Sequence, residues 1–571
     1  MLHRLACLLL PAALLACSQP TPPLPTPALP ASEALQLHSA LFRKGVEKVT
    51  DGVYVAIGYS LANSIMLEGD DGIVIVDTLE SRRRAEEVLA AFREITPKPV
   101  KAVILTHNHA DHVFGGLAFT GGDPTIPVYA HDTTSEIIDK LVSVISNATY
   151  ARSMRMFGQL LSDAKVPNAG IGPGLDYHPD QMALARPTHT FADTLDITVA
   201  GIRMQLLHAP GETPDQIMVW LPDKKVLLPA DNIYQAFPNL YTIRGTAYRD
   251  VLEWVDTVDH MRDLAPEFLV PSHTRPLAGA DAIQETLTAY RDGIQYVHDQ
   301  TVRGMNAGKT PGQLAAEVRL PPHLEAHPWL QPHYGTVPWS VKGIYDGYLG
   351  WFDGNAATLE PLPPAERSQR WADAFASGKP LQEQAQAALA ASDAAWAAEL
   401  ADHWVRLEPD NADARACLAG SFELLAADHT SPNGRNYFLT QAAELRGALT
   451  ITPTDKSTLP DEFVDSLPIG HFMRALPVRL KAEETLDLDE VALFVFTDAQ
   501  QEFTVHLRRG VAEVRERTHP NPDLRITTTS GTWKRLATQK LNPAQALLTG
   551  DLQIDGGVLA VRRFLGFFDT D

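Results

Sequence analysis

Short apolar runs alternate with amphipathic segments over residues 35–280. Residues 72–77 (GIVIVD) and 100–106 (VKAVILT) contain continuous apolar runs, which predict buried strands. Between them, residues 82–95 place apolar side chains at helical spacing. The order strand, helix, strand predicts an α/β layered domain over residues 35–280.

The pattern becomes helical over residues 281–430. Residues 388–426 are rich in alanine and carry Leu, Trp and Ala at helical spacings. This stretch weakly resembles a helix-hairpin repeat of the tetratricopeptide kind, and an antiparallel helix pair used for packing or dimerisation is the favoured interpretation. Cys417 lies inside it, and we expect a buried structural thiol there.

Strand patterns return over residues 440–571. Residues 492–498 (ALFVFTD) and 503–517 (FTVHLRRGVAEVRER) alternate apolar and polar positions as a hairpin does. The sequence therefore predicts a third unit, a small α+β domain with its own core.

The first residues are typical of an export signal. Arg4 precedes an apolar run over residues 5–15, which is too short to span a bilayer and favours a cleaved signal peptide. The LLAC sequence that ends at Cys17 resembles a bacterial lipobox, which implies cleavage before Cys17 and a lipid on its sulfur. The alternative is a plain secretory signal with an incidental cysteine. We expect a signal peptide over 1–17, a Pro-rich tether over 18–34, and a periplasmic or cell-surface lipoprotein.

Composition excludes several classes of protein. Of 571 residues, 45% are hydrophobic and 21% are charged, which is typical of globular domains. A formal net charge of −22 argues against a general nucleic-acid binder, which needs a basic surface. An anionic substrate stays possible, because a site can carry its own positive charge. Three cysteines are too few for a disulfide scaffold or a Cys-rich zinc module. The chain after the signal lacks long apolar runs, so we expect membrane contact only through the lipid.

The densest group of potential metal ligands follows the apolar run that ends near residue 105. His107, His109, Asp111 and His112 fall within six residues, which predicts a metal site. Residues two apart project to one side of an extended turn, so His107 and His109 could bind one ion while Asp111 and His112 face a second. Imidazole and carboxylate ligands suit two Zn²⁺ ions, with Fe or Mn possible.

This loop resembles the HxHxDH loop of the metallo-β-lactamase superfamily, which implies an αββα fold and a one- or two-metal site. By their order along the chain, Glu212, Asp231 and His273 resemble the later ligands, with Asp231 as the acid that bridges two metals. Many members have a histidine where Glu212 stands. Two alternatives remain at this point: Glu212 starts a helix and His208 is the ligand, or Asp231 caps a turn.

A finer resemblance is to the alkylsulfatase branch of that superfamily. It is carried by PGETP at 210–214, by the 19-residue separation from Glu212 to Asp231, and by NLYTIRG at 239–245. HYGT at 333–336 and YLGWFDGN at 348–355 are similar to the branch's helical dimerisation domain, and the C-terminal region looks like a sterol-carrier-type domain. The resemblance implies a homodimer formed through the helical domain.

The resemblance also implies an activity: hydrolysis of sulfate monoesters of alkyl chains to alcohol and inorganic sulfate by a metal-bridged hydroxide. Asp111 and Asp231 are then the catalytic acids that hold the metals. Arg244 is the expected clamp for the sulfate of an amphiphilic substrate, with Asn239 and Tyr241 adding neutral hydrogen bonds. The alternative for Arg244 is a structural ion pair with Asp250. Tyr248 and His333 are the candidates for protonating the leaving group.

Two departures from the branch leave other functions open. The bridging acid of the branch is usually Glu, whereas this chain has Asp231, and a His that commonly precedes NLYT is replaced by Pro238. One alternative is therefore a dinuclear metal hydrolase of an aryl sulfate, phosphoester or lactone. The other is a non-catalytic surface lipoprotein with a vestigial metal site.

Overall fold

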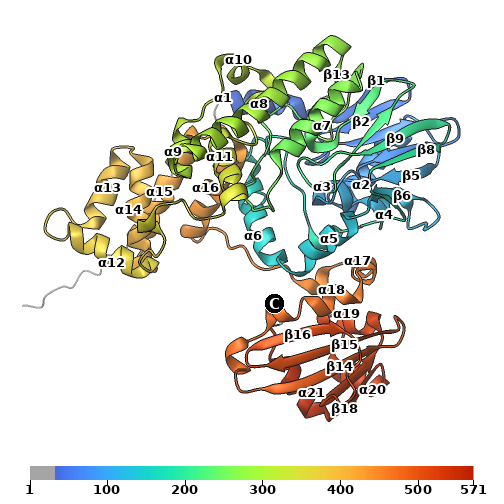
Figure 1. Ribbon diagram of the computed structural model, residues 1–571, viewed down its shortest axis with the longest axis vertical. Coiled ribbons are helices and arrows are strands. Elements are labelled where there is room, and N and C mark those ends of the chain that lie inside the picture. The colour runs from blue at the N-terminus through green and yellow to red at the C-terminus, as the bar shows by residue number, and fades with distance from the viewer. Residues whose placement is uncertain (1–32, 570–571) are drawn as a thin grey trace, which may run out of the picture.

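Two β-sheets packed face to face form the N-terminal half of the computed structural model, which describes residues 33–569 (Figure 1). The first sheet has the strand order β1 (Gly45–Thr50), β2 (Val53–Ile57), β3 (Ser64–Glu68), β4 (Ile73–Val76), β5 (Val100–Ile104), β6 (Val128–His131) and β7 (His189–Phe191). The second has the order β13 (Leu277–Ala278), β12 (Phe268–Leu269), β11 (Val226–Leu228), β10 (Ile217–Leu221), β9 (Ile202–His208) and β8 (Thr194–Val199).

The predicted strand–helix–strand unit is confirmed. Strand β4 is followed by helix α2 (Arg82–Arg93) and pairs in parallel with β5, placing Ile75 beside Val103. The Ser81 hydroxyl caps α2 by accepting a hydrogen bond from the backbone N–H of Arg84. Every residue of β4 is buried, and so is every residue of β5 except Lys101, which explains why the two strands read as apolar runs rather than as alternating ones.

Helices cover the outer face of each sheet, so the expected αββα architecture is confirmed. One apolar cluster fills the space between the sheets. Val55 and Val76 of the first sheet and Leu206 of the second belong to it. The remaining helices of this region are α1 (Glu33–His38), α3 (Ala110–Val113), α4 (Gly116–Thr120), α5 (Thr134–Ser143), α6 (Ser146–Phe157), α7 (Val251–Asp263) and α8 (Ala280–Asn306).

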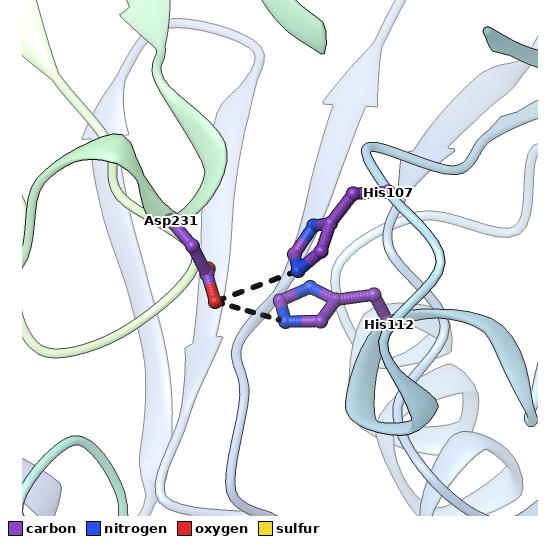
Figure 2. A group of neighbouring side chains, drawn as sticks. All are labelled: His107, His112 and Asp231. Carbon is purple, nitrogen blue, oxygen red and sulfur yellow. Dashed lines mark ion pairs between the residues drawn. The ribbon is translucent and has the colours of Figure 1, made fainter. Parts of the chain in front are cut away.

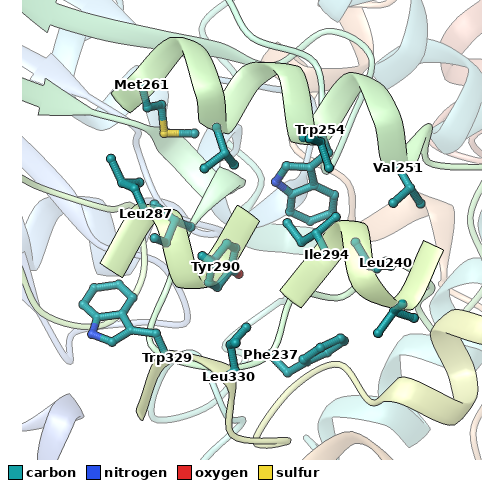
Figure 3. Close-up of a cluster of buried hydrophobic side chains, with 14 of the residues drawn as sticks. Phe237, Leu240, Val251, Trp254, Met261, Leu287, Tyr290, Ile294, Trp329 and Leu330 are labelled. Atoms are coloured by element: carbon teal, nitrogen blue, oxygen red, sulfur yellow. The ribbon is translucent and has the colours of Figure 1, made fainter. Parts of the chain in front are cut away.

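Helices α7 and α8 lie on the second sheet and share a buried apolar cluster with it (Figure 3). Trp254 of α7 and Tyr290 and Ile294 of α8 are fully buried there. Helix α8 lies beyond residue 280, where we expected the catalytic domain to end, yet it packs as part of the outer layer of the sandwich.

The helical region follows α8. It contains α9 (Pro311–Glu317), α10 (Pro322–Glu325), α11 (Val337–Leu349), α12 (Pro364–Phe375), α13 (Leu381–Ala390), α14 (Ala394–Leu407), α15 (Ala412–Asp428) and α16 (Pro432–Leu445). Helices α13 to α16 pack one on the next, so the expected helix pair is part of a longer run. Cys417 is buried in α15 as a free thiol. Helix α16 crosses the expected boundary at 430–440 and packs on α6.

The C-terminal region is an α+β unit with one five-stranded sheet, as expected. The strand order is β16 (Val511–Glu516), β15 (Gln501–Arg508), β14 (Asp489–Phe496), β17 (Leu524–Thr528) and β18 (Leu552–Asp555). Its helices are α17 (Asp461–Ser466), α18 (Ile469–Arg474), α19 (Ser530–Ala537), α20 (Pro543–Thr549) and α21 (Val558–Gly566). No helix in residues 33–569 is long and apolar enough to span a bilayer.

Helix α17 joins this unit to the catalytic sandwich. Phe463 and Leu467, the latter just after α17, belong to the buried cluster on the outer face of the first sheet. The ring of Phe463 meets Phe114 edge to face, with 5.9 Å between centroids. Phe114 lies two residues after His112, so the C-terminal unit contributes a core residue directly behind the predicted metal loop.

We expect Phe463→Ala to destabilise the protein by about 3 kcal/mol, because it leaves a cavity in a close-packed core. Urea unfolding measures the loss. Val478→Ala is the matched control, since Val478 is exposed and its truncation should have little effect. Equal effects of the two substitutions would show that α17 is only loosely attached.

Candidate metal centre

The predicted metal loop leaves strand β5 at the edge of the sandwich and turns into the short helix α3. His109 occupies the N-cap position of α3 with an extended backbone, which separates His107 and His109 from Asp111 and His112. The backbone N–H of Ile217 in β10 donates to the Thr106 carbonyl at 2.9 Å. The Asn108 amide donates to Asp215 at 2.6 Å, so the loop is tied to the second sheet and to the turn after β9.

The structure brings together all seven residues for which the sequence predicts metal ligation. Their donor atoms form three groups, each within 4.8 Å: His107, His112 and Asp231; Asp111, His112 and His273; and His109, Glu212 and Asp231. Figure 2 shows Asp231 facing His107 and His112, with Oδ2 at 3.7 Å and 3.4 Å from their Nε2 atoms. Asp231 and His112 each belong to two of these groups.

Each of the three later residues sits in a turn at the same edge. Glu212 lies between β9 and β10, Asp231 lies in the single turn that follows β11, and His273 follows β12. Ala230, just before Asp231, has a φ of +54°, an unfavourable conformation for alanine. Such strain persists where the surroundings hold the backbone, and here it places the short Asp231 side chain among the histidines.

Asp77, which the sequence analysis missed, organises the histidines. It is buried at the end of β4 and accepts hydrogen bonds from the Thr106 backbone N–H, the Thr106 hydroxyl and the Ser272 hydroxyl at 2.8–2.9 Å. His112 Nδ1 also lies 2.8 Å from Asp77 Oδ2, which leaves His112 Nε2 directed at the cluster. The only sequence signal for Asp77 was its place directly after the apolar run of a predicted buried strand.

His107 and His273 are oriented in the same way. His107 Nδ1 is 3.0 Å from the Thr106 hydroxyl, and His273 Nδ1 is 2.9 Å from the Leu61 carbonyl oxygen. Each ring therefore presents Nε2 to the acids, as a metal-binding histidine does when its other nitrogen is held.

Two arginines lie beside the acids: Arg249 is buried and Arg244 is partly buried. Arg249, also missed from the sequence, donates to Glu212 Oε1 at 2.7 Å and to the Asn239 carbonyl at 2.6 Å. Arg244 Nη2 lies 3.0 Å from His109 Nε2, at the opening of the cluster. Burial, followed by the charge of Arg249, lowers the pKa of Arg244 below its usual range.

The electrostatics of the cluster favour neutral His107 and His109 and added positive charge elsewhere. Burial, together with neighbouring histidines, lowers the pKa values of His107 and His109 well below the ordinary range. At His112, burial is outweighed by Asp231 and Asp111, which raise its pKa. A cluster with this many carboxylates stabilises a cation, whether a proton or a metal ion.

The other predicted residues lie elsewhere. His208, the alternative ligand, stacks on His131 and contacts the Pro214 carbonyl. Asp250 caps α7 through the backbone N–H groups of Leu252 and Glu253, so it is no partner of Arg244. Asn239 is buried, and Tyr241 packs against Gly343 of α11.

Neither candidate for leaving-group protonation reaches the cluster. His333 stacks on His38 at 4.0 Å, and burial lowers its pKa. Tyr248 is 42% exposed and packs against Tyr348 and Gly347. His333, Tyr248, Asn239 and Tyr241 also do not line the cavity that begins at the metal-ligand cluster.

A cavity of about 250 Å³ starts at the cluster and extends between the catalytic and C-terminal units. Asp111, Glu212, Asp231, Arg244 and Tyr334 line its polar end. The rest of the wall is mainly apolar and comes from α5, α6, α17, α18 and α19, with Phe157, Leu467 and Trp533 among the lining side chains.

Comparison with known proteins identifies the family. Residues 57–273 match the metallo-beta-lactamase superfamily, residues 310–448 the alkyl sulfatase dimerisation family, and residues 457–571 the alkyl sulfatase C-terminal family. The chain is 37% identical over 521 residues to a linear primary-alkylsulfatase of a Pseudomonas species, covering 89% of this chain and 98% of that protein. It is 28% identical to an alkyl/aryl-sulfatase of Saccharomyces cerevisiae, over 92% of this chain and 82% of that one.

A solved structure agrees over the whole fold. The stereoselective inverting sec-alkylsulfatase of a Pseudomonas species superposes with a TM-score of 0.87 at 28% identity, covering 94% of this chain and 87% of that one. An αββα sandwich with a His- and acid-rich edge defines the metallo-beta-lactamase class. Within that class, the chain belongs to the alkylsulfatase family.

We expect Asp77→Asn to weaken metal binding by about 10- to 100-fold, because an amide cannot accept all four hydrogen bonds and His112 loses its orientation. Competition with a chelator measures the affinity. Asp71→Asn, an exposed acid close in sequence, is the control. Unchanged affinity in Asp77→Asn would remove Asp77 from the support of the metal ligands.

Proposed function

We propose that this protein is a metal-dependent alkylsulfatase, which hydrolyses sulfate monoesters of alkyl chains to the alcohol and inorganic sulfate. The observation that carries the proposal is one cavity with a cluster of metal-ligand residues at one end and a mainly apolar wall beyond it. An alkyl sulfate has the matching shape, with a compact anionic head and an apolar tail. The similarity to curated alkylsulfatases over most of the chain supports the same substrate class.

The residues present fit a pair of divalent metal ions. His112 Nε2, Glu212 Oε2 and Asp231 Oδ1 are buried without a hydrogen bond, although buried polar atoms normally have a partner. We assign His107, His109 and Glu212 to one ion, Asp111, His112 and His273 to the other, and Asp231 to both. Zn²⁺ suits this ligand set, with Fe or Mn as the alternatives. The ions would supply Lewis-acid activation of water and of the ester.

The chain's own side chains prepare the site for this reaction. Asp77 holds His112, and Arg249 holds Glu212 through a buried ion pair. Arg244 lies at the cavity end of the cluster, where its guanidinium can bind two oxygens of a sulfate. Tyr334 lines the same end, and burial raises its pKa above the ordinary range, so its hydroxyl stays a neutral hydrogen-bond donor.

The apolar wall would bind the alkyl tail. Burying apolar surface stabilises a complex by roughly 25 cal/mol per Å², so affinity should grow with chain length until the cavity is filled. Part of that wall belongs to the C-terminal unit. We therefore propose that the C-terminal unit binds the alkyl tail while the metal cluster binds the sulfate.

We further propose a homodimer formed through the helical region. The family model for alkyl sulfatase dimerisation matches residues 310–448, and Trp351 at the end of α11 is 74% exposed, as an unpaired interface residue would be. Sedimentation of the purified protein as a monomer at micromolar concentration would contradict this.

We also propose export and lipid attachment at Cys17, which lies outside the residues that the structure describes. The support is the lipobox-like sequence that ends at Cys17. Palmitate labelling of the native protein and of Cys17→Ser tests the proposal, and equal labelling of the two would contradict it.

The metal-loaded protein should release inorganic sulfate from dodecyl sulfate, and His109→Ala should abolish most of this release by removing a metal ligand. Sulfate is measured by ion chromatography. Failure to turn over dodecyl sulfate, with turnover of an aryl sulfate, phosphodiester or lactone instead, would identify one of the alternative hydrolases. Lack of turnover with less than about half an equivalent of metal would favour the non-catalytic alternative.

Arg244→Ala should raise KM for dodecyl sulfate by about 10- to 100-fold, because a charge-assisted hydrogen bond to the substrate contributes roughly 1.5–3 kcal/mol. The metal content should stay unchanged. Arg203→Ala is a control, since Arg203 is exposed and pairs with Asp223 on the surface. An unchanged KM would exclude Arg244 as the sulfate clamp.

A further inference from the structure

A second arginine, Arg479, lines the part of the cavity wall that the C-terminal unit forms. Arg479 ends a short 3-10 turn, Pro477–Arg479, that precedes the five-stranded sheet. It lines the same cavity as the acids of the metal cluster, together with Leu476 and with Trp533 and Thr538 from the α19 segment. Arg244 and Arg479 thus supply cationic groups to one cavity from two different domains.

The guanidinium of Arg479 has no partner among residues 33–569. Its side chain makes no hydrogen bond or ion pair with any of them, although its backbone carbonyl accepts a hydrogen bond from the N–H of Asp569. Burial lowers its pKa, and no carboxylate offsets the effect. Two other cations at this junction have partners: Arg186 pairs with Asp139, and Lys534 donates to the Asp465 carbonyl at 2.9 Å.

A partly buried guanidinium loses part of its hydration, and a counter-ion or hydrogen bonds normally compensate for that loss. Structural arginines elsewhere in the chain have partners, as Arg155 has Glu444 and Arg415 has the Leu445 carbonyl. Arg479 faces a cavity with a mainly apolar wall instead. A ligand that satisfies both features carries an oxyanion on an apolar chain.

We propose that Arg479 forms a second head-group site, which binds the sulfate or carboxylate of a single-chain amphiphile whose chain lies in the cavity. The inference deepens the proposed function and rests on it for the sulfate case. The site captures an anionic amphiphile at the C-terminal end of the cavity, apart from the metal cluster. A sulfate ester held there is a substrate awaiting transfer, and a carboxylate held there is a competing ligand.

The test is calorimetric titration of the full-length, metal-loaded protein with decane-1-sulfonate, below its micelle concentration. The sulfonate cannot be hydrolysed at an ester bond, because its sulfur is bonded to carbon. Titrations are made in an Arg244→Gln background, which weakens head-group binding at the metal end. Adding Arg479→Gln should lower the affinity for the sulfonate by about tenfold or more, as expected for a lost charge-assisted hydrogen bond.

Three controls isolate the head-group contact. Arg479→Lys should retain most of the affinity, since the positive charge remains. Arg474→Gln, which removes an exposed arginine of the same segment, should have little effect. Binding of decan-1-ol should be the same in all variants, because the neutral chain does not need the cation.

Repetition with decanoate identifies the head group: the anion whose affinity falls more on Arg479→Gln is the one the site prefers. The proposal is overturned if Arg479→Gln leaves both affinities unchanged, or if decan-1-ol binding falls by the same factor. The titration requires no turnover, so it can succeed or fail independently of hydrolysis of dodecyl sulfate by the unmodified enzyme.

Discussion

Neutralising the buried charge of Asp231 is the constraint around which the catalytic half is arranged. Asp231 is almost fully buried, with His107, His112 and His273 on one side and Glu212 close by. A buried carboxylate is stable only with charged or hydrogen-bonding partners. Because those partners come from separate loops of both sheets, they meet only when the two sheets are stacked in register. The site thus depends on the whole sandwich.

The same constraint explains what could be predicted from the sequence. Strands β4 and β5 and the helix between them were predictable from local sequence, because the strands are short apolar runs and the helix has apolar residues at helical spacing. The loop from His107 to His112 was predictable from the density of its ligands. Glu212, Asp231 and His273 were found through their order in a family pattern, and the fold then brought them to the loop.

The sequence could not reveal the residues whose role is created by long-range contact. Asp77 and Arg249 are single charged residues without a local motif, and their importance appears only where His112 and Glu212 approach them. Conversely, Tyr241, Tyr248 and His333 carry suitable chemical groups but pack away from the cavity. The extent of α16 was missed because its buried face is polar, with Asn433 and Asn436 among its buried side chains, so apolar periodicity is weak there.

The insertion of Phe463 behind the metal loop has a consequence for biosynthesis. Phe114 and its neighbours on the first sheet are made more than 300 residues before the side chain that covers them. During synthesis, an apolar surface of the catalytic sandwich therefore stays uncovered until the segment near residue 463 has been made. Such surfaces attract chaperones and promote aggregation. The catalytic half therefore completes its packing only after the C-terminal segment that contains Phe463 has been made.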